Sequence, residues 1–511
     1  MIAFRTPGSE MQERMDCNYY HPRYVENSLK IGRQPCCKFA ATYSQTAIGL
    51  TASVEPHYSQ SGIGVPFVSG KAIKAFELQT DGSERITFES HNGPLADCKL
   101  WPGMLLVVRK GEVGNACVVP EAAGELSCAS EVMFFEMRTT DEAYFFAAFF
   151  NAQHGRLAVE RLQRGTIIFG VSLLDIPPLR VFWPDPKVRR YIGDKVRQAE
   201  RLREHARALE AFIAGKFTFL AANLLPPKKA WWASHTAIDS YRINSPHYDA
   251  VVLDMLEKAR AATGLVSLQS LVGPRDIAGG ATPLGAEYPP DGVFFVRVQN
   301  VKPYRLDLSD AAYIDAATDE ELKRSRCAEG DVILSITGYP GTASIVMAED
   351  LPVNINQHSV RFDIVGGLSP EFVTAALNSP FLKKQVDRLA IGGTREALDY
   401  TSVGDLQIPI LPKADRDEIT TWVSTSNRCV RAASRLTTAS KFLVEALIEG
   451  KVSEAELVAA QEALERGDDT ADRALLRRLT RHGLDVAGQP PLFPDLDALY
   501  ALLAQTQEGT E

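Results

Sequence analysis

The chain repeats itself, and this repeat limits the available folds more than any other feature of its 511 residues. Landmark residues of the first half recur in the same order in the second half, displaced by 227 to 230 positions. A shared order of six landmarks indicates a tandem duplication of one folded unit, not a single large core. The paired landmarks are 14–20 with 242–248, Gly103 with Gly330, Gly111 with Gly338, Asn151 with Asn378, Gly165 with Gly393, and Ser172 with Ser402.

Each repeat is expected to open with a β-rich globular unit. Glycine-punctuated apolar runs at 64–73 and 103–121 predict strands joined by turns, and their counterparts at 292–301 and 330–350 predict the same strands again. The periodic stretch 142–162 predicts a helix that follows the strands. These patterns favour an α+β fold, in which the strands of each unit pack with small helices.

Each repeat is expected to end in a long helix with a narrow apolar seam. Apolar residues recur at steps of three and four between Lys187 and Ile213, with Gly215 as a stop signal, and a similar seam lies between Pro412 and Gly450. So narrow a seam suits an antiparallel coiled-coil pair. A helix of 27 residues is about 40 Å long, and one turn of B-form DNA is about 34–36 Å, so such a pair could hold two globular units one turn apart. The seam residues are Val188, Ile192, Val196, Ala199, Leu202, Ala206, Leu209 and Ile213 in the first helix and Ile419, Val423, Val430, Ala433, Leu436, Leu443 and Leu447 in the second.

The last segment, 451–511, has no counterpart after the first helix, so it was added to the duplicated chain. It is acidic and helical in pattern, and Ser453 and Glu456 have the spacing of a capping box at its start. The expected organisation has a pseudo-twofold repeat plus this small helical extension. We place globular units at 1–186 and 226–411, spacer helices at 187–225 and 412–450, and the extension at 451–511.

Composition and charge limit the class of protein. With 45% hydrophobic and 23% charged residues, no apolar run of 18 residues and no signal-peptide core, we expect a soluble cytoplasmic protein without a membrane segment. The eight cysteines lack metal-ligand spacing and are expected to be reduced, so no metal site is predicted. Of the net charge of −9, residues 449–511 carry −7 (13 acidic and 6 basic side chains). The rest is close to neutral, so the overall charge does not exclude a nucleic-acid partner.

The order of these segments resembles the specificity (S) subunit of type I restriction–modification systems. The resemblance covers roughly residues 10–455. It implies that the globular units are target recognition domains spaced by the helices, and that the chain has no catalytic residues and no cofactor. The motifs that carry it are VPFV at 65–68, GMLLVVRKGEVG at 103–114, GDVILSITGYPG at 330–341, NINQHSVRF at 354–362, AALNSPFLKKQV at 375–386, TSVGDLQIPILP at 401–412 and LVEALIEGKV at 443–452.

The resemblance also implies a set of partners: double-stranded DNA with a split, asymmetric target, two DNA methyltransferase (M) subunits docked on the helices, and endonuclease/translocase (R) subunits. Two alternatives stay open. The first is a specificity-like DNA reader of another phage-defence system, which the unusual extension favours. The second is a fused methyltransferase or nuclease. Against it, 378–381 (Asn-Ser-Pro-Phe) lacks the second proline of the Asn/Asp-Pro-Pro-Tyr motif, and in a Pro-Asp…Glu-x-Lys match Glu321 lies in a polar stretch.

Sequence reading needs polar side chains on turns and strand ends that reach base edges, with cations nearby for phosphates. Among the candidates, Arg395 on the turn 392–395 is the strongest, because a guanidinium on a glycine turn can approach guanine. For every cluster the simpler interpretation is a solvated turn. The candidate DNA contacts are Arg109, Lys110, Asn115, Gln163, Arg164 and Thr166 in the first unit, and Gln299, Asn300, Lys302, Thr337, Tyr339, Asn356, Gln357, His358, Thr394 and Arg395 in the second.

Overall fold

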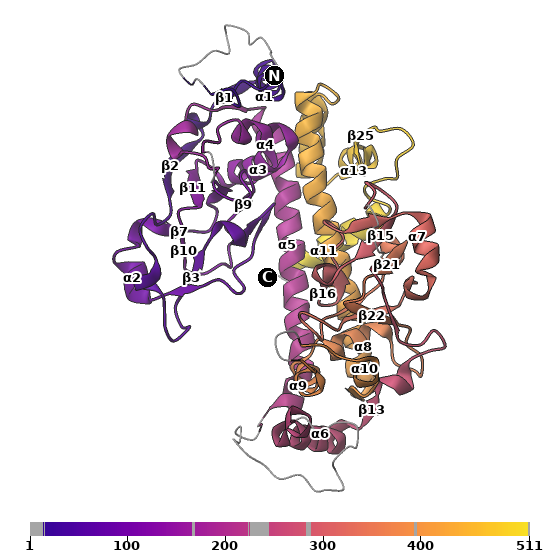
Figure 1. Ribbon diagram of the computed structural model, residues 1–511. Coiled ribbons are helices and arrows are strands. Elements are labelled where there is room, and N and C mark those ends of the chain that lie inside the picture. Colours follow the sequence, from indigo (N-terminus) through magenta and orange to yellow (C-terminus); the bar gives the residue numbers. More distant parts are fainter. Residues whose placement is uncertain are drawn as a thin grey trace. The chain divides into compact units, whose positions relative to one another are not determined.

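The computed structural model describes residues 14, 16–165, 169–222, 224, 245–282, 288–392 and 396–508. The chain divides into two compact units of helices and short strands (Figure 1). Unit 1 comprises Met1–Glu204 and Val430–Glu511, and unit 2 comprises His205–Cys429. The mixture of elements is the α+β fold that the sequence predicts.

Unit 1 contains two small four-stranded sheets. One has the order β2-β11-β8-β9 and is antiparallel throughout; the other has the order β6-β3-β10-β7, in which only β10 and β3 run parallel. Helix α3 packs on β8, β9 and β11 and is followed by α4. The bounds are β2 Tyr43–Ile48, β3 Val65–Val68, β6 Arg85–Ile86, β7 Lys99–Leu100, β8 Leu105–Val108, β9 Ala116–Val118, β10 Leu126–Cys128, β11 Val132–Met137, α1 Pro22–Gly32, α2 Phe88–Asn92, α3 Thr140–Asn151 and α4 Gln153–Glu160.

Unit 2 repeats this plan. Its sheet β14-β22-β19-β20 corresponds to the first sheet of unit 1 and β18-β15-β21 to the second, and β21 and β15 are again a parallel pair. In both units a two-stranded sheet pairs a strand that precedes the larger sheets in the sequence with a strand that follows them, β1 with β12 and β13 with β23. The bounds are β1 Cys36–Lys38, β12 Arg180–Phe182, β13 Leu265–Ser267, β14 Ala278–Gly279, β15 Val293–Val296, β18 Ala312–Ile314, β19 Val332–Ser335, β20 Ala343–Ile345, β21 Val353–Ile355, β22 Ser359–Phe362, β23 Gln407–Pro409, α6 Ala250–Thr263, α7 Ala316–Glu321, α8 Pro370–Leu377, α9 Pro380–Leu389 and α10 Tyr400–Gly404.

The duplication extends to single hydrogen bonds. The amide of Asn151, the last residue of α3, accepts from the backbone NH of Ala116 (3.2 Å) and donates to its carbonyl (2.7 Å) and to a carbonyl one turn earlier (2.8 Å). Asn378, just after α8, makes the same three bonds with Ala343 (3.1 and 2.8 Å) and its own helix (2.8 Å). Each amide therefore ties a helix to β9 or β20 and satisfies backbone groups that would otherwise be buried unpaired.

A strained aromatic residue also recurs at the tip of a hairpin in each unit. Phe76, between β4 (Ile73–Lys74) and β5 (Glu77–Leu78), has φ of 66°, and Tyr304, between β16 (Val301–Lys302) and β17 (Arg305–Leu306), has φ of 69°. Their carbonyls accept hydrogen bonds from Arg203 of the long helix α5 (Pro186–Thr218; 3.3 Å) and from Asn427 of the long helix α11 (Lys413–Ile448; 3.0 Å). A left-handed conformation is unfavourable for a bulky residue, so these contacts hold both tips in place.

The long helices are part of the core. Helix α5 (Pro186–Thr218) and helix α11 (Lys413–Ile448) each belong partly to unit 1 and partly to unit 2. In unit 2 they run antiparallel, because Lys216 bonds to Asp415 (2.5 Å) while the Phe212 ring lies 5.9 Å from that of Trp422. The predicted seam is confirmed: its residues are at most 7% exposed, apart from Val430, which is partly buried.

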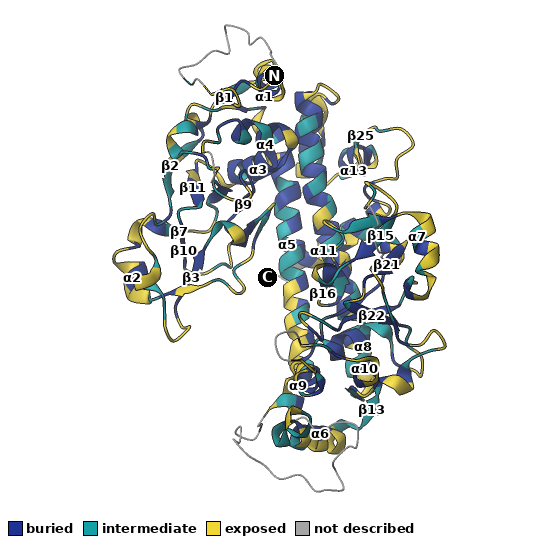
Figure 2. Cartoon of the chain, viewed as in Figure 1, coloured by how far each residue is buried: buried dark blue, intermediate teal, exposed yellow. Residues whose placement is uncertain are grey.

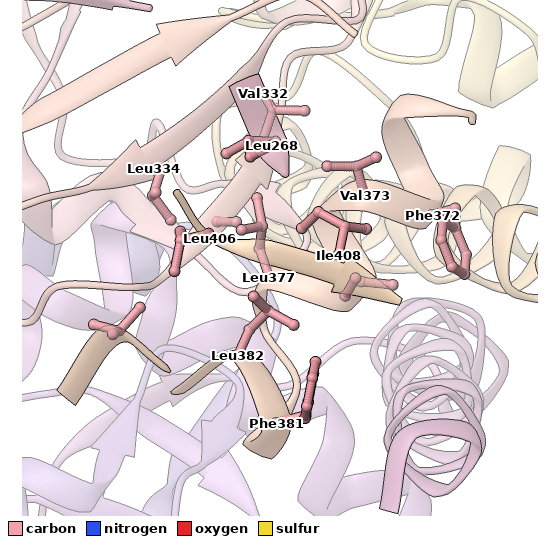
Figure 3. Close-up of a cluster of buried hydrophobic side chains, with 14 of the residues drawn as sticks. Leu268, Val332, Leu334, Phe372, Val373, Leu377, Phe381, Leu382, Leu406 and Ile408 are labelled. Carbon is pink, nitrogen blue, oxygen red and sulfur yellow. The ribbon is translucent and has the colours of Figure 1, made fainter. Parts of the chain in front are cut away.

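Unit 2 shows how the seam joins the globular core. Ile213 and Phe217 of α5 and Ile419 and Val423 of α11 are buried in the same cluster as side chains of the sheets and of α8 and α9. Figure 3 shows part of this cluster, in which leucine and isoleucine side chains from strands and helices meet. The helices therefore share the core of the globular unit and are not a separate stalk.

Three predicted boundaries are wrong for local reasons. Helix α5 continues through Gly215 to Thr218, because burying Phe217 outweighs a glycine cost of about 1 kcal/mol. The stretch 142–162 forms two helices, since the chain turns sharply and brings Gly155 against the Phe149 carbonyl, where a Cβ would lie at 1.9 Å. The segment 451–511, predicted to be helical, is interrupted: helix α13 (Thr470–Arg477) is followed by a hairpin over 479–484, with Gly483 at φ of 131°.

The C-terminal extension is a folded part of unit 1. The capping box of Ser453 and Glu456 is confirmed, with the Glu456 NH 3.3 Å from the serine oxygen and the Ser453 NH 3.1 Å from the glutamate. The elements that follow are α12 Glu454–Glu465, α13 Thr470–Arg477, β24 Leu479–Thr480, β25 Gly483–Leu484 and α14 Leu496–Glu508.

A buried carboxylate anchors the extension to α5. Asp472 of α13 accepts from the Lys195 ammonium (2.7 and 2.8 Å), from Tyr191 (2.5 Å) and from Tyr500, and its side chain is 2% exposed. Burial alone would raise the pKa of Asp472, but the ammonium and the two hydroxyls outweigh it, so the pKa lies below its ordinary value. Around this anchor, Glu462 pairs with Lys187 (2.5 Å).

We predict that Asn151→Ala and Asn378→Ala each lower the free energy of unfolding by about 1–3 kcal/mol, because buried backbone groups lose their partners. Chemical denaturation of the full chain would measure both. Asn92→Ala, which removes an exposed amide, is the control and should change the unfolding free energy by less than about 0.5 kcal/mol. Equal effects of all three variants would contradict the structural role.

We predict that Asp472→Ala lowers the free energy of unfolding of unit 1 by about 3–5 kcal/mol, because it leaves the Lys195 charge buried without a counter-charge. The double variant Lys195→Met/Asp472→Leu should restore much of it. Because the pKa of Asp472 is lowered in the folded chain, its contribution to stability is complete at pH values above the ordinary pKa of 3.8. This contribution is lost only as the pH falls through the lower pKa of the folded state. Hydrogen exchange of α13 and α14 would measure both effects. Unchanged protection in Asp472→Ala at neutral pH, or loss of protection in the unmodified chain near neutral pH, would contradict them.

Candidate nucleic-acid interface

Two predicted contact clusters of unit 1 form one surface. The turn after β8 and the loop after α4 are joined by backbone bridges between Lys110 and Gly170 and between Arg164 and Gly170. The Val171 NH donates to the Arg109 carbonyl (3.0 Å), and Arg164 and Gly170 exchange two backbone bonds (2.8 and 3.0 Å). We call residues 109–115 together with 163–171 the unit 1 loop pair; 166–168, which include the candidate Thr166, lie outside the described residues.

Unit 2 contains the same arrangement. Ala397 forms backbone bridges with both Thr337 and Ile391, and the Leu398 NH donates to the Ile336 carbonyl (2.9 Å), as Val171 does to Arg109. We call residues 336–341 together with 391–398 the unit 2 loop pair. Thr394 and Arg395 lie outside the described residues, so the structure gives no position for the strongest candidate.

Within the unit 1 loop pair, the side chains divide into internal and surface groups. Arg109 is half-buried and donates to the carbonyls of Val171 (2.8 Å) and Ser130 (2.9 Å). Asn115 is buried, donates to Glu112 (2.6 Å) and accepts from Arg156 (2.9 Å). Both side chains therefore hold the loop in shape.

Among the predicted contacts of the unit 1 loop pair, those that reach the surface are Lys110, Gln163 and Arg164. Lys110 and Gln163 are half-buried. Arg164 is exposed and pairs with Asp175 (2.5 Å). The Asp175 carboxylate holds the Arg164 guanidinium at the edge of the loop pair and leaves 58% of the arginine side chain accessible to solvent.

Unit 2 presents different chemistry on the same scaffold. Tyr339 is 82% exposed on a turn that the Ser335 hydroxyl fixes by donating to the Tyr339 carbonyl (2.7 Å). Thr337 lies 2.5 Å from Nδ1 of His358, and His358 contacts the exposed amide of Gln357 (3.4 Å). A polar chain therefore runs from the turn to Gln357, which also accepts from Thr282.

The other unit 2 candidates have structural partners. Asn300 is fully buried, donates to Asp307 (3.0 Å) and Asp310 (2.6 Å) and accepts from the Arg297 NH (3.0 Å). Gln299 is exposed but donates to Asp310 (2.8 Å). Asn356 is 6% exposed and accepts from the His358 NH (3.1 Å), whereas Lys302 is exposed.

Some exposed groups beside the loop pairs were not among the candidates. Phe169 and Ile391, which belong to the loop pairs, are each 49% exposed, and Leu174, which follows the unit 1 loop pair, is 85% exposed. An apolar run bounded by glycines predicts a buried strand, so nothing in the sequence indicated that Phe169 is exposed. Phe169 also borders a hollow of about 370 Å³. The hollow is lined by Asn18, His21, Arg23, Tyr24, Glu160, Arg161, Gln163 and Phe169.

In the part of the chain that the structure describes, no group of three or more His, Cys, Asp or Glu side chains is placed to hold a metal ion. None of the described helices is long and apolar enough to cross a membrane.

Sequence comparison matches no protein-family model and no curated protein. The chain is similar to the crystal structure of a type I restriction–modification S subunit from M. genitalium, with 12% identity and a TM-score of 0.40, over 80% of this chain and 94% of that one. It is also similar to the HsdS subunit from Thermoanaerobacter tengcongensis (13%, TM-score 0.25, 85% and 96%) and to a chain from a type I R-M complex (13%, TM-score 0.27, 83% and 96%). These are structures of the family that the sequence motifs resemble, but at such scores the similarity alone assigns no function.

We predict that Asn300→Ala lowers the free energy of unfolding by about 1–3 kcal/mol, because it removes three internal bonds from a fully buried amide. Its exposed neighbour provides the control: Gln299→Ala should change it by less than about 0.5 kcal/mol. Thermal or denaturant unfolding of the two variants would separate a structural amide from a surface one. A larger effect of the Gln299 variant would contradict this assignment.

Proposed function

We propose that this chain is the DNA-specificity subunit of a type I restriction–modification complex. It binds double-stranded DNA through one loop pair in each unit, recruits methyltransferase (M) and endonuclease/translocase (R) subunits, and performs no catalysis itself. The observation that carries the proposal is that two copies of one scaffold present loop pairs with different exposed side chains.

The two loop pairs share a scaffold but differ in their exposed side chains, and this difference has a direct consequence for recognition. Each unit holds its loop pair by the same backbone bonds. The unit 1 loop pair brings Lys110 and Arg164 to the surface, whereas the unit 2 loop pair exposes Tyr339 and is linked through His358 to the exposed amide of Gln357. Base edges in the major groove are read by such side chains, so two different tips read two different sequences. The target is then bipartite, with one half-site for each unit.

The side-chain contacts of the loop pairs define roles for the candidates. Lys110 and Arg164 of unit 1 lie at the surface, where a phosphate can reach them. Gln163 in unit 1 and Tyr339 and Gln357 in unit 2 are the groups placed to meet bases. Arg109, Asn115, Asn300 and Asn356 maintain the loops, as their internal bonds require.

A second candidate function is a DNA reader that directs a different phage-defence effector. The folded extension favours it, because residues 454–508 add a docked helical segment to the duplicated chain. Identification of the chains that copurify with the full-length protein distinguishes the two. A methyltransferase with a translocating endonuclease supports the first proposal, and another effector supports the second.

We predict that Lys110→Ala and Arg164→Ala each weaken DNA binding and reduce the slope of log Kd against log salt by about 0.9, the value for one phosphate contact. Titrations of the full chain at several salt concentrations would measure the slope. Lys30→Ala is the control, at a lysine of α1 whose side chain is 43% exposed and pairs with Glu26. An unchanged slope for both loop variants would contradict phosphate contacts at this surface.

We also predict that Tyr339→Ala and Gln357→Ala alter one half of a bipartite methylation motif, because both side chains belong to unit 2. Gln163→Ala should alter only the other half. Methylome sequencing of cells that express the complete complex with each variant would show the change. A single substitution that changes both halves would refute the assignment of one half-site to each unit.

A further inference from the structure

The hollow that borders Phe169 lies beside the unit 1 loop pair, and we call it the unit 1 hollow. Its volume of about 370 Å³ falls within the range of roughly 300–1,000 Å³ that is typical of small-molecule sites. Residues at the start of α1, at the end of α4 and in the loop pair line it, and α1 and α4 pack against each other. Figure 2 shows that α1 carries exposed residues next to buried ones, so part of this helix faces solvent.

Two arginines place positive charge in the unit 1 hollow. Arg161 is 7% exposed and is held by its bond to the Tyr19 carbonyl (3.0 Å). The side chain of Arg23, at the start of α1, is 56% exposed; it donates to the Tyr24 hydroxyl and lies 3.8 Å from Glu160, too far for a hydrogen bond. Because a guanidinium has five N–H donors, Arg23 keeps donors that a phosphate can accept.

The unit 1 hollow also combines an aromatic ring with amide side chains. Phe169 is 49% exposed, and an exposed ring offers a face on which a base can stack. Asn18 is exposed and Gln163 is half-buried. Amides both donate and accept hydrogen bonds, as the edges of bases require. The lining therefore supplies what a nucleotide needs: a stacking face, partners for a base edge and a cation for the phosphate.

The repeat shows that the fold does not require this lining. Arg388 donates to the His247 carbonyl (2.7 Å) as Arg161 does to that of Tyr19, which relates the two units by 227 positions at the arginine and 228 at the carbonyl. The equivalent bonds of the Val171 and Leu398 NH groups place Phe169 opposite Glu396. Unit 2 thus has acidic or apolar side chains where unit 1 has polar, cationic and aromatic ones: Pro246 for Asn18, Asp249 for His21, Val251 for Arg23, Ala390 for Gln163 and Glu396 for Phe169.

We propose that the unit 1 hollow binds one nucleotide that leaves the stack of the bound DNA, with its base against Phe169 and its phosphate at Arg23. This rests on the proposed function and deepens it, because unit 1 then reads one base of its half-site outside the double helix. Such a base presents its Watson–Crick edge, which Asn18 and Gln163 can recognise. The acidic positions of unit 2 repel a phosphate, so each chain has this site in unit 1 alone.

A free nucleotide has the same base and phosphate, but the position of the hollow favours DNA. Gln163 and Phe169 belong both to the hollow and to the unit 1 loop pair. Lys110 and Arg164 lie at the surface of that loop pair, where they can hold the phosphates of neighbouring nucleotides. A nucleotide in the hollow is then one part of a longer bound strand.

The test uses the full chain without methyltransferase subunits, because methyltransferases extrude bases themselves. The duplexes carry the motif that the chain selects from a random pool, with a mismatch at each position in turn. At one position of one half-site the mismatch should lower the Kd at least about tenfold, because an unpaired base leaves the stack at a smaller cost. At the same position, 2-aminopurine should become brighter when the chain binds, since it is no longer quenched by stacking.

Substitutions connect both signals to the unit 1 hollow. Phe169→Ala and Arg23→Gln should each abolish the fluorescence increase and the preference for the mismatch. Both side chains are exposed, so the variants should fold. Phe88→Ala, at a phenylalanine of α2 that is 52% exposed, and Arg33→Gln, at an exposed arginine just after α1, are the matched controls. They should keep both signals.

The outcomes separate this inference from the proposed function. Duplex binding without a preferred mismatch and without a fluorescence increase would overturn the nucleotide site alone, as would signals that survive in both hollow variants. Titration with the four deoxynucleoside monophosphates and with inorganic phosphate tests the source. If a free monophosphate binds in an Arg23-dependent manner and the duplex gives no signal, the hollow takes a free nucleotide and the DNA assignment is wrong.

Two further results have equally definite meanings. Inorganic phosphate that binds as tightly as the monophosphates would remove the role of the base. A chain that binds no duplex at any salt concentration, but binds a monophosphate through Arg23, would overturn the proposed function and the DNA source while leaving a nucleotide site in unit 1.

Discussion

The apolar seams of α5 and α11 are the constraint on which the remaining structure depends. Their residues are nearly all inaccessible, and in unit 2 the cluster that contains Ile213 and Ile419 also contains the strands and short helices of the globular part. A narrow seam needs another helix to cover it, since its flanks are charged. The seam therefore pairs the two helices, and its ends anchor the sheets that carry the loop pairs.

The duplicated unit separates buried and strained residues, which must stay constant, from exposed turns, whose side chains can vary. Asn151 and Asn378 make the same three bonds, and Phe76 and Tyr304 adopt the same unfavourable backbone conformation against the helices. These features lie in buried or strained positions, where substitutions are costly. The loop pairs, in contrast, contain solvent-exposed turns, in which side chains can change with little effect on stability. This difference in energetic cost allows the exposed turns to diverge while the scaffold stays the same.

The sequence could predict those features that depend on periodicity and order. The seams, the strand regions and the capping box at Ser453 are all visible in local patterns. The sequence could not predict contacts between segments that are far apart in the chain and meet only after folding. Asn300 reads as a surface amide until its bonds to 307–310 are seen, and Gly215 reads as a helix end until Phe217 is seen to be buried. The two unit 1 clusters were predicted separately, because only the folded chain brings Lys110 beside Gly170.

The acidic extension resolves the conflict between the charge of the chain and a nucleic-acid partner. In unit 1, carboxylates of the extension, including Glu462 and Asp472, are paired with cations of α5. A cation of the same unit neutralises each of these carboxylates, so they contribute less to the repulsion between the extension and phosphates. The Lys195–Asp472 pair is buried, and salt screens buried pairs far less than exposed ones. Under the proposed function, salt that weakens phosphate contacts at the exposed loop pairs therefore leaves the extension attached, so that DNA affinity and the integrity of unit 1 become separable properties of one chain.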